Sequence, residues 1–303
     1  MYSITPILLA GGNGARLWPS SRKNYPKQFI KFNSEKSLFQ QSVLRLTSTN
    51  IFKMNPQIVI TNDLFRFIVI DQLKLAGADL GTILIEPEAK NTAAAIIAST
   101  IYAMKDNKDA IVIAAPSDHV IPDTKYFKEM IKLGIKAVGN GKIVTLGINP
   151  SHIETGYGYL KIQNSDKSEI KKVIQFIEKP DLISAKKMLN DGNYLWNSGI
   201  FMYRAKDIVL AFQKHASEIL FFAQKSLELS VKDNYFIRLN PKYWKNIDDI
   251  SIDYAIMEKV NNLVAVPYLS KWSDLGNWDA VWRESQKDKN GVVFHASSRK
   301  HSY

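Results

Sequence analysis

The sequence predicts an α/β fold with a Rossmann-like, mostly parallel (mixed) sheet and helices on both faces. In the first half of the chain, short continuous apolar runs that fit buried strands alternate with longer runs that fit helices. Polar or glycine-rich segments follow several of these apolar runs directly. Ligands bind at the carboxyl ends of the strands in such sheets, so we expect a site along that edge.

The elements of the first half follow from apolar periodicity and from residues typical of helix ends. Asn62 and Asn91 are predicted helix caps, because an amide oxygen can accept from the free N–H groups of a first turn. Gly77 follows the second helix, as is typical of a helix end. The expected strands are 4–10, 57–61, 82–85, 110–115 and 142–148, and the expected helices are 37–46, 63–75, 92–104 and 125–138.

The second half has longer excursions between its strands, which suggests a sheet extension that carries a second substrate. Ser251 is a predicted N-cap, and Asp253 is favourably placed near the positive end of the helix that follows. The expected strands are 156–160, 173–178, 196–203, 263–266 and 291–294, and helices are expected over roughly 206–229 and from 249–254 onward.

Composition excludes several classes of protein. No apolar run approaches the roughly 18 residues of a membrane span, and the N-terminus lacks the features of a signal peptide. The absence of cysteine excludes disulfides and thiolate metal sites and fits a cytoplasmic protein. The net charge of +11 is spread over scattered lysines rather than basic blocks, so we expect anionic small molecules and no nucleic acid as partners.

A glycine-rich segment with trailing cations follows the first strand. Gly11, Gly12 and Gly14 would let backbone N–H groups approach an anion closely. Arg16 and Lys27 could then reach separate phosphates, arginine as a fork and lysine as a point charge. The pattern predicts a polyphosphate site; the alternative is a tight turn with surface charges.

Two familiar phosphate loops do not fit this segment. The P-loop pattern is absent. The dinucleotide pattern has Leu17 where its third glycine belongs, and the prolines at 19 and 26 keep the segment extended where a helix would be required. A dinucleotide-dependent dehydrogenase is therefore disfavoured.

Two aspartates are candidate metal ligands. Asp118 follows a buried strand, and Asp274 lies between Trp272 and Gly276. Mg²⁺ binds one or two carboxylates and completes its shell with phosphate oxygens and water. The alternative is a helix cap or turn role for each, and His119 is expected to be structural.

Polar residues near two later strands are candidates for a sugar phosphate. Glu178 could accept from sugar hydroxyls while Lys179 binds a phosphate, and the Asn197 amide can both donate and accept. The alternatives are a solvated strand end and a turn. No catalytic triad, cysteine nucleophile or histidine cluster is visible, but a phosphate monoester is largely ionised at neutral pH, with a second pKa of ~6, and needs no general base.

The chain resembles mannose-1-phosphate guanylyltransferases, within the wider sugar-nucleotide pyrophosphorylases. The matching segments run in family order across nearly the whole chain. They are 9–22 with 26–29, 86–87 with 91–93, 116–119, 155–159, 176–180, 196–201, 251–259 and 272–278.

The resemblance implies that GTP and mannose 1-phosphate react, with Mg²⁺, to give GDP-mannose and pyrophosphate. It places two sets of residues at the nucleotide and the metal, and a third set at the sugar phosphate. The nucleotide set is Gly11, Gly12, Gly14, Arg16 and Lys27; the metal set is Asp118 and Asp274; the sugar set is Gly158, Glu178 and Asn197, with Lys179 on the sugar phosphate. Of these, Arg16, Lys27, Asp118 and Lys179 are the expected catalytic residues. Beside this implied set, Glu86, Asn91, Thr92 and Ser117 are also expected at the nucleotide.

Glu86 is a hypothetical base reader, because a carboxylate accepts from guanine N1–H and N2–H₂ and would repel adenine N1. It could instead cap a helix or brace Lys90, where family members commonly carry arginine. The expected domains are a catalytic domain, 1–290, and the start of a β-helical extension, 291–303. We expect no isomerase activity, and a homodimer is left open.

Two other functions stay open. One is a related enzyme that uses another sugar 1-phosphate, such as a heptose or glucose, or another nucleoside triphosphate. The other is an inert nucleotide-sugar-binding regulatory subunit. Such a subunit would tolerate loss of Arg16, Lys27, Asp118 or Asp274, and all four are present.

Overall fold

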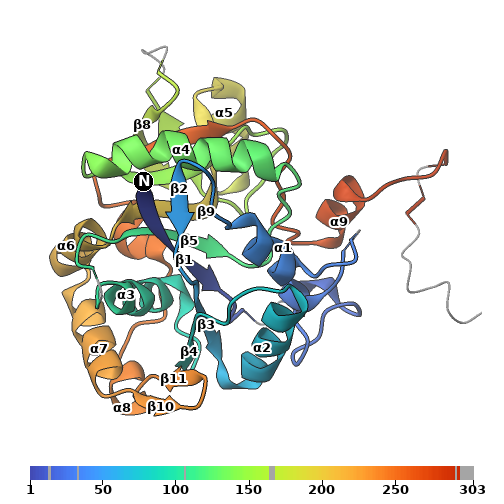
Figure 1. Ribbon diagram of the computed structural model, residues 1–303. Helices are drawn as coiled ribbons and strands as arrows, with labels where there is room; N and C mark the ends of the chain where they lie inside the picture. Colours follow the sequence, from blue (N-terminus) through green and yellow to red (C-terminus); the bar gives the residue numbers. More distant parts are fainter. Residues whose placement is uncertain (13–14, 33, 106, 164–167, 291, 294–303) are drawn as a thin grey trace, which may run out of the picture.

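The computed structural model describes residues 1–12, 15–32, 34–105, 107–163, 168–290 and 292–293, and it shows helices on both sides of one twelve-stranded sheet (Figure 1). The strands are β1 (Tyr2–Leu9), β2 (Phe52–Met54), β3 (Ile58–Asn62), β4 (Thr82–Glu86), β5 (Ile111–Pro116), β6 (Ile143–Ile148), β7 (Tyr159–Ile162), β8 (Lys171–Ile177), β9 (Tyr194–Arg204), β10 (Val231–Asp233), β11 (Phe236–Arg238) and β12 (Leu263–Tyr268). The α-helices are α1 (Leu38–Arg45), α2 (Arg66–Leu75), α3 (Asn91–Ala103), α4 (Thr124–Gly139), α5 (Leu182–Asp191), α6 (Ala205–His215), α7 (Ser217–Glu228), α8 (Pro241–Trp244) and α9 (Trp278–Glu284).

The strand order is β10-β11-β4-β3-β1-β5-β9-β6-β12-β8-β7, with β2 paired to β1. Strands β1, β3, β4 and β5 are parallel, so their carboxyl ends lie on one edge of the sheet. Strand β9 runs antiparallel between β5 and β6 and also pairs with β7. The long β9 therefore joins the parallel first half to the mixed second half.

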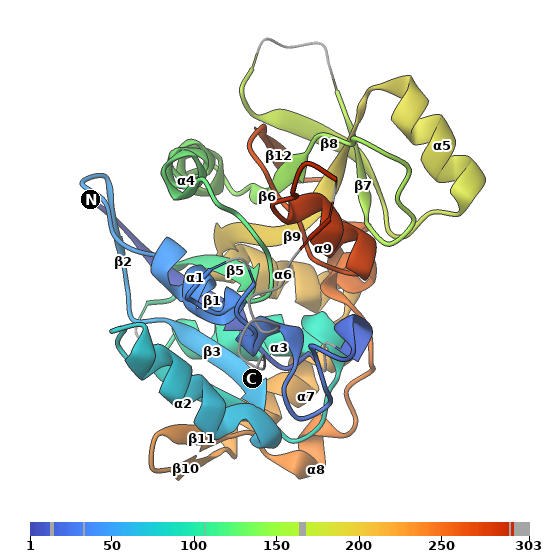
Figure 2. The same cartoon turned by 90° about the vertical axis from the view of Figure 1, so that its right-hand side faces the viewer.

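Both faces of the parallel strands are buried, which explains their continuous apolar runs. Ile4 and Leu8 of β1 belong to a core shared with α1, α2 and α4. Ile7 of the same strand belongs to the core on the opposite face, shared with α3, α6 and α7. Figure 2 shows the two groups of helices on opposite sides of the strands.

The strands and helices predicted for the first half are all present, with most ends shifted by a residue or two. The helix predicted over 63–75 begins with a 3₁₀ turn, Asp63–Phe65, and continues as α2. Asn62 caps its helical segment by accepting from the Phe65 N–H at 3.2 Å. The predicted cap at Asn91 is wrong, because α3 begins at Asn91 itself, with φ +58°, and Lys90 at the cap position makes no side-chain cap. The Asn91 side chain accepts from the N–H of the adjacent Thr92, at 3.0 Å.

In the second half of the chain, the observed elements differ more from the predicted ones. The strand predicted over 156–160 begins only at Tyr159, whereas the helices predicted over roughly 206–229 are present as α6 and α7, on either side of Ala216. The helix predicted from 249–254 is a short π-helical segment, Asp253–Met257, with the Ser251 hydroxyl accepting from the Tyr254 N–H at 3.4 Å. The strand expected at 291–294 and the extension 291–303 lie outside the described residues except for Val292 and Val293, which are not in a strand.

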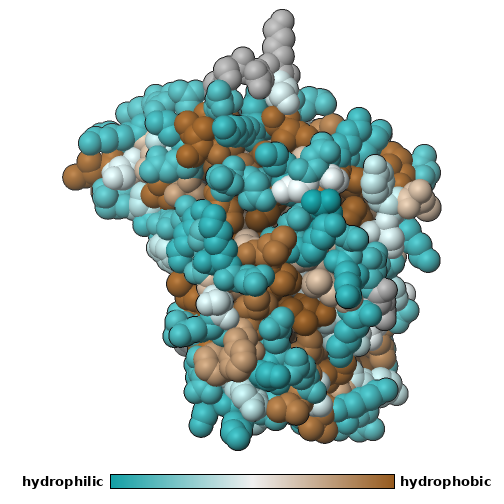
Figure 3. Space-filling view, turned by 90° about the vertical axis from the view of Figure 1, so that its left-hand side faces the viewer, coloured by the Kyte–Doolittle hydropathy of each residue, from teal (hydrophilic) through white to brown (hydrophobic). Residues whose placement is uncertain are grey.

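On the face seen in Figure 3, hydrophobic and hydrophilic side chains are interspersed. Among the described residues, the helices are all too short or too polar to traverse a lipid bilayer.

Candidate functional site

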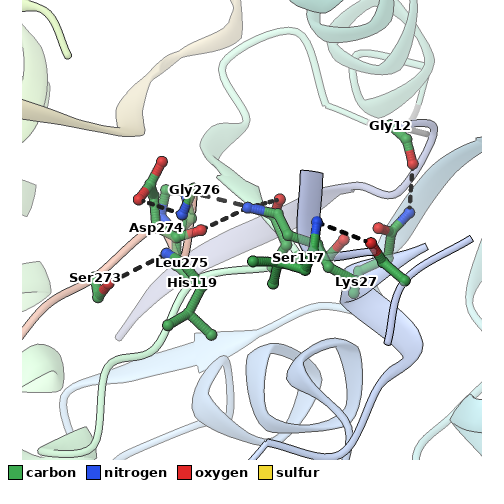
Figure 4. A network of polar contacts seen from close by, with 12 residues as sticks. Gly12, Lys27, Ser117, His119, Ser273, Asp274, Leu275 and Gly276 are labelled. Atoms are coloured by element: carbon green, nitrogen blue, oxygen red, sulfur yellow. Dashed lines mark hydrogen bonds and ion pairs between the residues drawn. The ribbon is translucent and has the colours of Figure 1, made fainter. Parts of the chain in front are cut away.

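The backbone that follows β1 is fixed by three side chains. Gln28 donates from Nε2 to the carbonyl oxygens of Ala10, at 3.3 Å, and Gly12, at 2.9 Å (Figure 4). Thr61 donates its hydroxyl to Ala10 at 3.0 Å, and Asn62 donates from Nδ2 to Gly11 at 3.2 Å. The glycine segment is thereby held against the end of β3, while Gly14 lies outside the described residues.

Glu86, the last residue of β4, lies directly against this backbone. A Cβ atom at Gly11 would be 2.1 Å from Glu86 Oε1, so a larger residue at this position would require the Glu86 carboxyl to move. Burial raises the pKa of Glu86 to about 7. A cavity of 170 Å³ opens here, lined by Leu9, Gly11, Gly12, Ile60, Glu86, Ala89, Asn91, Thr92 and Ala95.

The start of α3 forms the other wall of this cavity, which we call the glycine-loop cavity. The hydroxyl oxygen of Thr92 accepts from the Ile252 N–H at 2.9 Å, which ties α3 to the segment before the π-helix. Lys90 pairs with Glu88 at 3.2 Å and donates to the Lys245 carbonyl at 3.0 Å. Lys90 therefore has two partners other than Glu86.

The segment after β5 carries Ser117 and Asp118. The Ser117 hydroxyl is buried and donates to the Leu9 carbonyl at 2.7 Å, so it joins the ends of β5 and β1. The Lys27 ammonium lies 3.0 Å from Asp118 Oδ2 and 2.5 Å from the carbonyl oxygen of Asp274, as Figure 4 shows. The Lys27 ammonium thus brings three segments that are distant in the sequence into contact.

A short antiparallel bridge brings Asp274 to Asp118. Val120 and Ser273 exchange backbone hydrogen bonds of 2.8 and 3.1 Å. The Asp274 carboxylate then accepts from the Tyr157 hydroxyl at 2.7 Å and from the Gly276 N–H at 2.9 Å. Burial and the charge of Asp274 raise the pKa of Tyr157, so this phenol remains a donor.

The electrostatics keep Asp118 ionised. Burial by itself would raise the pKa of Asp118, but the charge and the hydrogen bond of the Lys27 ammonium lower it overall. Burial lowers the pKa of His119, whose ring packs edge-on against Trp272 with centroids 5.3 Å apart. Arg45, itself buried, donates to the His119 carbonyl at 3.1 Å, so His119 has the contacts of a packed structural residue.

A second cavity, of 150 Å³, holds the residues predicted for the sugar phosphate, and we call it the β9 cavity. A Cβ atom at Gly158 would be 2.5 Å from Glu178 Oε2 and 3.0 Å from the Phe176 ring, so a larger residue here would require Glu178 to move. Lys179 pairs with Glu178 Oε1 at 3.1 Å. The lining residues are Pro116, His119, Gly156, Tyr157, Gly158, Glu178, Lys179, Asn197, Ser198, Gly199, Asp253, Trp272 and Asp274.

Asp118 and Asp274 fit a cation of the Mg²⁺ type. Within the described ranges no group of three or more His, Cys, Asp or Glu side chains could enclose a metal ion. Two carboxylates nevertheless suffice for Mg²⁺ when phosphate and water supply the other ligands. The Lys27 ammonium shows that the space beside Asp118 and the Asp274 carbonyl stabilises a positive charge.

Three residues at the site were not predicted as functional. Gln28 and Tyr157 lie within recognised segments, but their partners are distant in the sequence. Asp253 lines the β9 cavity, although it was predicted only as a favourable charge near a helix start. The predicted Arg16 lies in a 3₁₀ turn, Ala15–Leu17, with its side chain exposed.

Residues 5–291 match the family described as nucleotidyl transferase. A curated relative, the mannose-1-phosphate guanylyltransferase of Sinorhizobium fredii, is 40% identical over 291 residues, which is 96% of this chain. The chain spans 56% of that relative, little more than half of its length.

Two solved structures have the same fold. One from Helicobacter pylori, described as a mannose-6-phosphate isomerase, has a TM-score of 0.77 at 30% identity and covers 89% of this chain and 99% of its own. One from Thermus thermophilus, described as a mannose-1-phosphate geranyltransferase, has a TM-score of 0.79 at 26% identity and covers 93% of this chain and 79% of its own. The predicted α/β fold is confirmed.

The raised pKa of Glu86 predicts a pH-dependent effect on stability. Between its ordinary value of 4.5 and about 7, the folded protein binds this proton more tightly than the unfolded chain does. The contribution of Glu86 to stability is therefore greatest below pH 4.5 and is lost as the pH rises through 7. When the pH is raised from 5 to 8, the free energy of unfolding of Glu86→Gln should increase relative to that of the wild type by up to about 3 kcal/mol.

Urea unfolding of both proteins at the two pH values measures this difference. Glu129→Gln, at an exposed position of α4, is the matched control and should show no gain. A Glu86→Gln effect that is the same at pH 5 and pH 8 would contradict the prediction.

Proposed function

Because the chain belongs to the nucleotidyl transferase family, we propose that it transfers GMP from GTP to mannose 1-phosphate and forms GDP-mannose and pyrophosphate. The name of the Sinorhizobium fredii relative supports this choice of substrates. The observation that carries the proposal is the pair of cavities at one edge of the sheet. In the strand order, Glu86 of β4 and Asn197 of β9 flank the β1 and β5 segments that bear Lys27 and Asp118.

In this proposal the glycine-loop cavity takes the nucleotide. Backbone N–H groups of the glycine segment and the charges of Arg16 and Lys27 neutralise the phosphates, since unhindered backbone and cations suit an anion. The nucleoside lies toward Glu86. Gly11, Gly12, Gly14, Asn91, Thr92 and Ser117 complete this proposed set.

The β9 cavity takes mannose 1-phosphate, with the sugar against Gly158, Glu178 and Asn197 and its phosphate near Lys179. A phosphate oxygen of the sugar attacks the α-phosphorus of GTP, and the bond from that phosphorus to the oxygen leading to the β-phosphorus breaks. That oxygen departs with pyrophosphate. The attacking group is already ionised at neutral pH, so positioning and charge neutralisation suffice without a general base.

Asp118 and Asp274 would hold Mg²⁺, which supplies charge neutralisation at the phosphates. Tyr157 and Gly276 orient Asp274 for this role by donating to its carboxylate. Lys27 keeps Asp118 ionised and therefore able to bind a cation. The cytoplasmic location, the absence of membrane and nucleic-acid partners and the domain division at 290 remain predictions, and a homodimer stays open.

The substrate assignment predicts one outcome from a panel of reactions. Pyrophosphate release should be fastest with GTP and mannose 1-phosphate, compared with ATP, UTP or CTP and with glucose or heptose 1-phosphates. The same protein should leave fructose 6-phosphate unchanged, although one related structure is described as an isomerase. A different preferred pair, no reaction at all, or formation of mannose 6-phosphate would each contradict the proposal.

The metal assignment predicts large losses from neutral replacements. Asp118→Asn and Asp274→Asn should each lower kcat about 100-fold or more at saturating Mg²⁺, because one charged ligand of the cation is removed. Asp71→Asn, at an exposed position of α2, should leave kcat unchanged. Rates equal to wild type in both site variants would remove the metal assignment.

The role of Glu86 in base recognition is tested with GTP and ITP. Hypoxanthine lacks the N2 amino group, so ITP loses one hydrogen-bond donor and leaves a Glu86 carboxylate oxygen unpaired. The wild type should therefore prefer GTP by about 1–3 kcal/mol. Glu86→Gln should lower kcat/KM for GTP and reduce the ratio of kcat/KM for GTP to kcat/KM for ITP. Equal kcat/KM in all four combinations would show that Glu86 does not read the base.

A further inference from the structure

Asp253 is a carboxylate in the β9 cavity that no step of the proposed reaction uses. It begins the π-helical segment Asp253–Met257, whose remaining side chains include the buried Ala255, Ile256 and Met257. The Asp253 side chain is only partly exposed and lines the cavity together with Glu178 and Asn197. A largely buried carboxyl at a cavity wall requires polar partners.

The amide of Asn197 is mostly committed to protein partners. Its Oδ1 accepts from the Thr145 hydroxyl at 2.9 Å and from the Gly199 N–H at 3.2 Å. Its Nδ2 donates to Asp253 Oδ1 at 3.0 Å. A carboxamide offers two acceptor sites and two N–H donors, so only one N–H remains for a ligand. Asn197 is therefore above all the group that orients Asp253.

The charges around Asp253 come from both neighbouring elements. Burial and the negative charge of Glu178 raise the pKa of Asp253 to about 7, and Lys179 opposes this effect. Glu178 also has a raised pKa, caused by burial and by the charge of Glu258, whose carboxylate accepts from the Glu178 N–H at 2.9 Å. Two carboxyls in one cavity resist joint ionisation, so near neutral pH one of them can hold a proton.

We propose that Asp253 binds hydroxyl groups of the sugar in the sugar phosphate, and that Thr145 and Asn197 position it. This inference rests on the proposed function and specifies how that site recognises a hexose. A carboxyl that can be either ionised or protonated offers both an acceptor and a donor, which matches the two-way hydrogen bonding of a hydroxyl. It follows that the cavity discriminates against analogues that lack the bound hydroxyl, because a buried polar group would then be unpaired.

The test compares mannose 1-phosphate with its 2-deoxy, 3-deoxy and 4-deoxy analogues at saturating GTP. In the wild type, at least one analogue should lose about 10-fold or more in kcat/KM. In Asp253→Ala, the KM for mannose 1-phosphate should rise while the KM for GTP stays within about twofold of the wild-type value. The ratio of kcat/KM for mannose 1-phosphate to kcat/KM for that same analogue, which we call the deoxy penalty, should fall about 10-fold. An unchanged penalty for every analogue would overturn the proposal.

A second pair of variants tests the positioning role and does not alter Asp253 itself. Thr145→Val keeps the shape but removes the hydroxyl that anchors Asn197, and Thr145→Ser keeps the hydroxyl. Thr145→Val should reduce the same deoxy penalty about threefold, and Thr145→Ser should restore it. If both variants discriminate between the substrates as the wild type does, Thr145 and Asn197 do not position Asp253. This test applies even if Asp253→Ala does not fold.

Failure of this inference differs from failure of the proposed function. If the wild type forms no sugar nucleotide from mannose 1-phosphate, the proposed substrate is wrong. The deoxy comparison is then made on whichever sugar 1-phosphate the enzyme accepts. If the wild type is active and Asp253→Ala discriminates equally well, only the role of Asp253 is wrong.

Discussion

The ammonium group of Lys27 is the contact on which the rest of the site depends, because it joins segments from both ends of the chain. It binds the Asp118 carboxylate and the carbonyl oxygen of Asp274, which is 247 residues away in the sequence. The Lys27 side chain is only 12% exposed, so the pairing is screened less than a surface ion pair would be. The adjacent β-bridge between Val120 and Ser273 joins the two segments that carry Asp118 and Asp274.

The topology of the sheet explains why two cavities share this centre. Parallel strands β1, β4 and β5 end on one edge and present the glycine segment, Glu86 and Asp118 there. Strand β9 runs the opposite way beside β5, and its first half brings Asn197 to the same edge. A nucleotide and a second substrate can therefore meet above the strands between the two cavities.

The sequence predicted most of the first half of the fold because buried parallel strands are short, apolar and separated by helices; the three-residue strand β2 was missed. It predicted the common edge for Gly11, Glu86 and Asp118 because parallel strands place their carboxyl ends together. Strands β10 and β11 were missed, since three residues each are too few for a period to be visible. The support of Asp253 by Asn197 was also missed, because side-chain pairs 56 residues apart leave no local pattern.

The proposed reaction is tested most directly by following oxygen atoms. Mannose 1-phosphate labelled with ¹⁸O in its terminal phosphate oxygens is incubated with GTP and Mg²⁺, and the products are examined by ³¹P NMR. Attack of the sugar phosphate on the α-phosphorus predicts ¹⁸O in the bridge between the two phosphorus atoms of GDP-mannose and none in pyrophosphate. Label in pyrophosphate, or a sugar nucleotide without ¹⁸O in that bridge, would contradict the mechanism.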